Sequence, residues 1–163
     1  GAGLDLDTFT GLVSTGIETL DNKWVGYGHS LTEIPMNANA QNSYIMWGGD
    51  ITDLTGKETC LVNFKKLKED YSVLDNITVR MAGVWYSSKA SGNIDVEITT
   101  YQGGSMTKSG KEILNNNGTI VQQLNFSKNI ALQGWKPSID QVNHIGYINY
   151  SQNLSAGEVV ITY

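Results

Sequence analysis

Two neighbouring stretches, "ITVRMAGVWY" (residues 77–86) and "NIDVEITTY" (residues 93–101), decide the fold class. In both, apolar side chains occupy every second position: Ile77, Val79, Met81, Ile94, Val96 and Ile98. Residues two apart on a strand share a face, so each stretch predicts a strand with one buried face. A polar linker, "SSKASG", separates them. We therefore expect residues 77–101 to form an antiparallel hairpin.

Further short β-type runs, separated by Gly, Asn, Ser and Thr, lie along the rest of the chain at residues 4–13, 43–47, 59–64, 119–126, 144–150 and 158–163. Helical signals are confined to "LVNFKKLKEDY" (residues 61–71) and a turn near Pro137. This pattern predicts one all-β domain over residues 1–163. We expect an antiparallel, jelly-roll-like β-sandwich with long loops and at most one or two short helices.

The composition and the motifs argue against several classes of function. The 163 residues carry a net charge of −5, which argues against nucleic-acid binding, and no apolar run approaches the ~20 residues of a membrane span. The single cysteine, Cys60, heads an apolar run and is expected to be buried and inert. No G-x-S-x-G, Walker, H-E-x-x-H or zinc-ligand pattern is present. We expect no enzymatic activity.

An acidic, glycine-rich loop, "WGGDITDLTGKE" (residues 47–58), supplies Asp50, Asp53 and Glu58. Near the start of the chain, Asp5 and Asp7 lie two apart and would share one face of a strand. Ca²⁺ takes six to eight oxygen ligands from such carboxylates, backbone carbonyls and water. Two interpretations stay open: the two elements enclose a Ca²⁺ ion, or both are solvated connections.

The order "DLD", an apolar strand, then "GD…TG…E" before "LVNF" resembles the calcium-binding domain of tellurium-resistance stress proteins. This resemblance implies a Ca²⁺-binding β-sandwich in the bacterial cytoplasm, with Asp5, Asp7, Asp50 and Glu58 as ligands. It covers about the first hundred residues. The chain departs from the family pattern in having Ile51 and Lys57 at positions where the family usually has Asn and Asp.

A second resemblance runs from about residue 43 to 110. Here "YIMWGGD", "ITVRMAGVWYSS" and "NIDVEITTYQGGSMTKSG" are similar to β-domains in structural proteins of tailed bacteriophages. The similarity implies a virion module from the tail, fibre or capsid surface, without catalysis. Its partners would be other virion proteins, further copies of the same chain in a homo-oligomer, and a glycan on the host surface.

Two aromatic groups are candidates for ligand contact. Trp24 and Tyr27 lie in "WVGYGH", where they either line a surface pocket for sugar or pack a loop onto the core. Trp85 and Tyr86 end the strand that begins at residue 77, where they are either core and rim residues or a ligand platform.

The sequence thus favours a non-enzymatic structural or attachment module of a phage virion, with Ca²⁺ as the candidate stabilising ion. Two alternatives remain. One is a cytoplasmic calcium-binding stress domain of the tellurium-resistance type, and the other is a carbohydrate-binding or carbohydrate-active domain.

Overall fold

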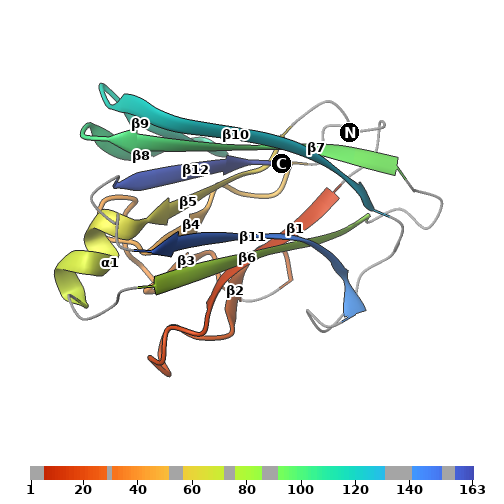
Figure 1. Ribbon diagram of the computed structural model, residues 1–163, viewed down its shortest axis with the longest axis horizontal. Helices are drawn as coiled ribbons and strands as arrows, with labels where there is room; N and C mark the ends of the chain where they lie inside the picture. The colour runs from red at the N-terminus through yellow and green to blue at the C-terminus, as the bar shows by residue number, and fades with distance from the viewer. Residues whose placement is uncertain are drawn as a thin grey trace.

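Two antiparallel sheets face each other and enclose a common core (Figure 1). The computed structural model describes residues 6–28, 31–51, 57–71, 76–85, 92–130, 141–151 and 157–163. The four-stranded sheet has the order β11-β6-β1-β2, formed by Asn143–Ser151, Asn76–Trp85, Leu6–Val13 and Lys23–Val25. The six-stranded sheet has the order β10-β7-β12-β5-β4-β3, formed by Thr119–Ile130, Gly92–Gln102, Glu158–Thr162, Thr59–Asn63, Ile45–Trp47 and Glu33–Ile34. The expected all-β sandwich is confirmed.

Period-two alternation builds the core between the sheets. On β6, the side chains of Ile77, Val79 and Met81 are fully buried, and on β7 Val96 and Ile98 face them with at most 3% exposure. These are the alternating positions of the two stretches that indicated strands. Burial of such side chains is the main favourable contribution to folding, roughly 1.5–3 kcal/mol for each large apolar group.

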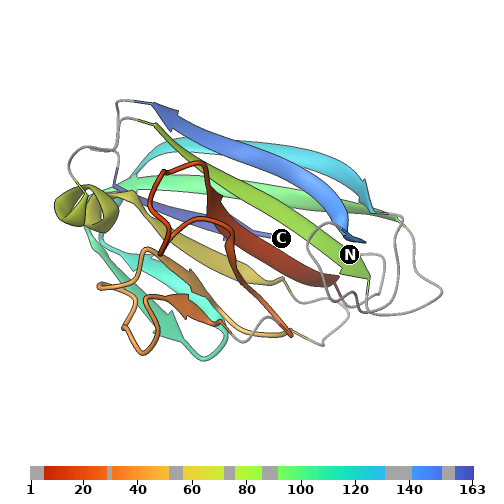
Figure 2. The same ribbon diagram turned by 90° about the horizontal axis from the view of Figure 1, so that it is seen from below.

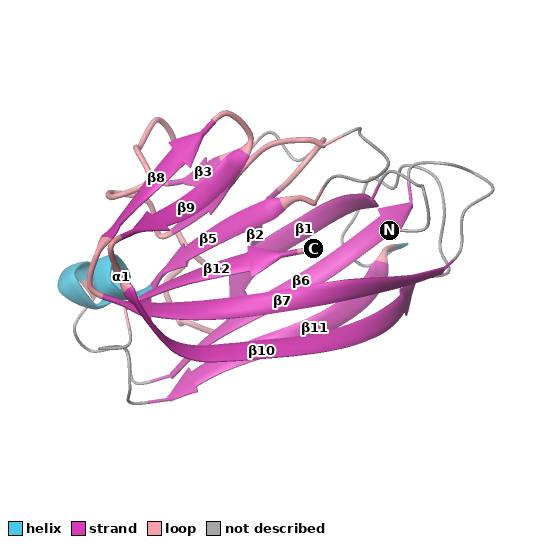
Figure 3. Cartoon of the chain, turned by 90° about the horizontal axis from the view of Figure 1, so that it is seen from above, coloured by secondary structure: helices cyan, strands magenta, loops and turns pink. Residues whose placement is uncertain are grey.

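A second, smaller core lies on the outer face of the six-stranded sheet. A hairpin of β8 (Ser105–Ser109) and β9 (Glu112–Asn116) covers this face (Figure 3). The smaller core consists of Ala40, Met46, Leu61, Met106, Ile113 and Val160. Strand β5 is consequently buried at all five positions, which explains why "TCLVN" is a continuous rather than an alternating apolar run.

The prediction that residues 77–101 form an antiparallel hairpin is wrong. Strand β6 pairs with β1 and β11, whereas β7 pairs with β10 and β12 in the other sheet. Both strands do have one apolar face, but those faces meet across the core instead of lying side by side. Period-two patterning identifies the buried face of a strand and not its neighbour.

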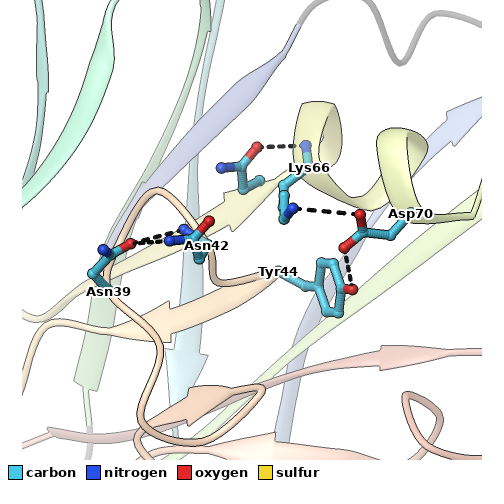
Figure 4. A network of polar contacts seen from close by, with 6 residues as sticks. Asn39, Asn42, Tyr44, Lys66 and Asp70 are labelled. Atoms are coloured by element: carbon cyan, nitrogen blue, oxygen red, sulfur yellow. Dashed lines mark hydrogen bonds and ion pairs between the residues drawn. The ribbon is translucent and has the colours of Figure 1, made fainter.

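The one helix among the described residues, α1 (Phe64–Asp70), lies within the segment expected to be helical and packs at one end of the sandwich (Figure 1). Asn63 caps it, accepting a hydrogen bond of 2.9 Å from the Lys66 amide, and Phe64 and Leu67 are buried. On its exposed side, Asp70 accepts from the Tyr44 hydroxyl and pairs with Lys66 at 3.3 Å (Figure 4). No helix in the described part of the chain is long and apolar enough to cross a membrane.

Four strands were not expected from the sequence: β2, β3, β8 and β9. Two of them have only two or three residues, too short for a periodic pattern. The turn expected near Pro137 falls outside the described residues.

Truncating a side chain in the smaller core tests its contribution. Met106→Ala removes a fully buried side chain and should lower the free energy of unfolding by about 2–4 kcal/mol. Ile120→Ala, on a residue that is 53% exposed in β10, is the control and should cost less than about 1 kcal/mol. Urea unfolding measures both. Equal losses would mean that the β8–β9 hairpin does not bury a core.

Candidate metal centre

Three acidic side chains converge where the two sheets meet. Asp7 comes from β1 of the four-stranded sheet, Asp50 from the loop after β4, and Glu58 from the position before β5. One carboxylate oxygen from each lies within 4.8 Å of the others. Asp7 and Asp50 are 43 residues apart in the sequence. The fold therefore brings residues of the N-terminal strand and of the acidic loop together, as the calcium hypothesis requires.

These carboxylates are removed from water. Asp7 is 2% exposed and Glu58 4%, while Asp50 is half-buried. One oxygen of Glu58, Oε2, accepts hydrogen bonds from the Thr8 hydroxyl (2.6 Å) and the Trp47 indole Nε1 (3.3 Å). Its other oxygen, Oε1, and Asp50 Oδ1 are buried without a hydrogen-bond partner. Leaving such an atom unsatisfied costs about 1–3 kcal/mol, and more when it is charged.

Two glycines allow the start of the acidic loop to lie close to Thr59 and Lys111. A Cβ at Gly48 would lie 2.5 Å from Thr59 Oγ1 and 2.8 Å from the Lys111 carbonyl oxygen, so no larger residue fits there. Gly49 has φ +129°, a backbone conformation that side chains disfavour. The Lys111 ammonium, at the β8–β9 turn, donates to the Asp50 carbonyl oxygen at 2.5 Å. This hairpin therefore contacts the start of the acidic loop, from Gly48 to Asp50.

Burial raises the pKa of the Glu58 carboxyl to about 8 from an ordinary value of 4.5. The hydrogen bonds from Thr8 and Trp47 oppose this shift, and the negative charges of Asp7 and Asp50 add to it. Without a cation, Glu58 therefore carries a proton at neutral pH. A bound cation would take the place of that proton, because it stabilises all three carboxylates in their charged form.

The geometry fits calcium. Ca²⁺–oxygen bonds are about 2.3–2.6 Å long, so two oxygens on one ion can lie up to about 5 Å apart, as these do. Three carboxylates provide part of the six to eight ligands, and backbone carbonyls or water would complete the set. Two further predicted ligands, Asp5 and Asp53, lie outside the described residues. Thr8 and Trp47, which orient Glu58, were not predicted because neither is itself a cation ligand by type.

The aromatic residues that were predicted to contact a ligand differ in their burial. Trp85 is fully buried and its indole Nε1 donates to the Ile130 carbonyl oxygen at 2.8 Å, so it is a core residue and not a ligand platform. Trp24 is half-buried and Tyr27 is 46% exposed. Tyr86 lies outside the described residues.

Cys60 is fully buried, as expected, and burial raises the pKa of its thiol to about 12. A thiol that stays protonated is a poor nucleophile.

Comparison with known proteins returns no matching family model, no matching curated protein and no matching solved structure.

The pH dependence of the unfolding free energy tests whether Glu58 is protonated in the ion-free folded protein. In chelator, the wild type should lose unfolding free energy as pH rises from about 4.5 to about 8, because the folded state holds a proton there that the unfolded chain releases. The slope should be on the order of 1 kcal/mol per pH unit. Glu58→Gln removes this component, and chemical unfolding across that pH range measures it.

The control is Glu112→Gln, which changes the charge equally at an exposed residue of β9 and should keep the wild-type slope. A Glu58→Gln protein with that same slope would refute the assignment.

Proposed function

We propose that the chain is a non-enzymatic structural or attachment module whose sandwich is locked by one Ca²⁺ ion bound to Asp7, Asp50 and Glu58. The observation that carries the proposal is the buried convergence of these three carboxylates, in which Glu58 Oε1 has no hydrogen-bond partner. An acidic cluster alone is common on protein surfaces. A buried acid with an unsatisfied oxygen is costly, and a cation offsets that cost.

The position of the three carboxylates supports a structural role. Asp7 belongs to the four-stranded sheet, whereas Asp50 and Glu58 flank the connection between two strands of the six-stranded sheet. An ion held by all three would cross-link the sheets. Because it binds the folded state and not the unfolded chain, it would add RT ln(1 + [Ca²⁺]/Kd) to stability.

The setting we propose is the virion of a tailed bacteriophage, where the chain would contact other virion proteins or further copies of itself. The resemblance over residues 43–110 supports this, and the residues that carry it have defined structural roles. Trp47 donates to Glu58, Met106 is buried in the smaller core, and Gly103 and Gly104 turn the chain with φ of 70° and 78°. The rival setting is the bacterial cytoplasm, as a stress domain of the tellurium-resistance type.

The genes flanking the coding sequence separate these settings. Capsid and tail genes on either side are the expected result. A neighbourhood of stress-response genes would contradict the virion proposal and leave the calcium proposal standing.

A calcium titration followed by thermal unfolding tests the ion itself. At calcium concentrations about 100-fold above Kd, the wild type should gain roughly 2.7 kcal/mol, a rise in Tm of about 5–10 °C for a chain of this size. Asp50→Asn should lose most of this rise, because it removes one ligand charge. Mg²⁺ should give a smaller rise, since it demands closer octahedral geometry and keeps its waters.

Glu18→Gln, at an exposed acid outside the cluster, serves as the matched control and should respond to calcium as the wild type does. The proposal fails if millimolar calcium leaves the wild-type Tm unchanged, or if Asp50→Asn gains as much as the control.

A further inference from the structure

The outer face of the four-stranded sheet carries one row of residues that crosses all four strands. The register aligns Trp24 on β2 with Gly11 on β1, Gly11 with Arg80 on β6, and Arg80 with Tyr147 on β11. Directly opposite residues share a face. Their chain neighbours Val25, Leu12, Val79 and Ile148 are buried in the core, so the row faces away from it. Figure 2 views the molecule from the side of this sheet.

Gly11 lets the aromatic ring lie close to the sheet. A Cβ at this position would be 2.6 Å from Trp24 Cε3, so the indole occupies the space that a side chain would fill. The Arg80 guanidinium carbon lies 5.8 Å from the centroid of the same ring, within cation–π range. Trp24 and Arg80 thus form one continuous surface across β1.

His144 completes the surface from β11. Its Nδ1 accepts a hydrogen bond of 3.3 Å from Arg80 Nε, and its ring centroid lies 4.6 Å from that of Tyr147. Burial, together with the positive charges of Arg80 and Lys128, lowers the pKa of the His144 imidazole below its ordinary 6.5. The neutral ring therefore carries its proton on Nε2, where it can donate.

This surface offers several hydrogen-bond donors, and Arg80 has no carboxylate partner among the described residues. An arginine side chain has five N–H donors, and Nε is the one that binds His144. Among the residues that the structure describes, no carboxylate pairs with Arg80. The Tyr147 side chain at the end of the row is 59% exposed, and Trp24, Arg80 and His144 are half-buried. A fork of guanidinium N–H groups matches a carboxylate, and exposed aromatic faces match the apolar face of a sugar ring.

We propose that Trp24, Arg80, His144 and Tyr147 form a binding surface for a carboxylate-bearing saccharide. The Nη groups of Arg80 bind the carboxylate, His144 Nε2 donates to a neighbouring oxygen, and the pyranose ring packs on the aromatic side chains. A sugar is favoured over an acidic peptide because two aromatic side chains, Trp24 and Tyr147, flank the Arg80 guanidinium in this row. This surface goes beyond the calcium proposal and uses none of the three carboxylates.

The test uses an array of immobilised oligosaccharides bearing uronic or sialic acid, neutral oligosaccharides of matched length, and polyglutamate. Wild type should bind acidic glycans and not their neutral counterparts. Arg80→Lys keeps the charge but loses the fork, and should weaken binding at least tenfold. Tyr147→Ala changes a mostly exposed side chain, so it should fold normally and also bind at least tenfold more weakly.

Leu114→Ala is the control, since Leu114 is a 43% exposed apolar residue of β9, outside the row, and its loss should leave binding unchanged. The proposal is overturned if no acidic glycan binds, if Arg80→Lys and Tyr147→Ala bind as the wild type does, or if polyglutamate binds more tightly than every glycan. The calcium-induced rise in Tm, measured on the same preparations, shows whether the calcium proposal fails or holds independently.

Discussion

Three carboxylates at one junction, two of them buried and one half-buried, are the constraint on which the rest of the structure depends. Negative charges in a medium of low polarity repel one another and lose their hydration, so the fold must neutralise them. Protonation of Glu58 and binding of a cation are the two ways of doing so, and they compete for the same oxygens. A bound Ca²⁺ would keep Glu58 ionised, whereas the ion-free protein keeps a proton on this carboxyl.

Much of the surrounding architecture serves this junction. The β8–β9 hairpin buries a second core and also positions Lys111, whose ammonium binds the Asp50 carbonyl oxygen and whose own carbonyl lies close to Gly48. A loop of this composition would be costly to order without such contacts, because glycine loses the most backbone freedom on folding. The three parts of the "WGGD" segment therefore have separate roles: the tryptophan donates to Glu58, the glycines permit close approach, and the aspartate contributes a carboxylate to the acidic cluster.

The sequence predicts local features of this fold better than distant ones. Alternation at Ile77, Val79 and Met81 identifies the buried face of β6. Of the five acids that the sequence offers as candidate ligands, Asp7, Asp50 and Glu58 lie in one cluster. Strand partners are not encoded in that alternation, which is why β6 and β7 were expected to pair although they face each other across the core. The row from Trp24 to Tyr147 could not be found from the sequence either, since it exists only through the register of four strands.

A crystal structure of the protein grown in millimolar calcium tests the central claim most directly. Anomalous scattering should then locate one ion bonded to oxygens of Asp7, Asp50 and Glu58 at about 2.3–2.6 Å. Electron density showing only water between these side chains, or Glu58 in direct hydrogen-bond contact with a neighbouring carboxylate at that calcium concentration, would contradict the account.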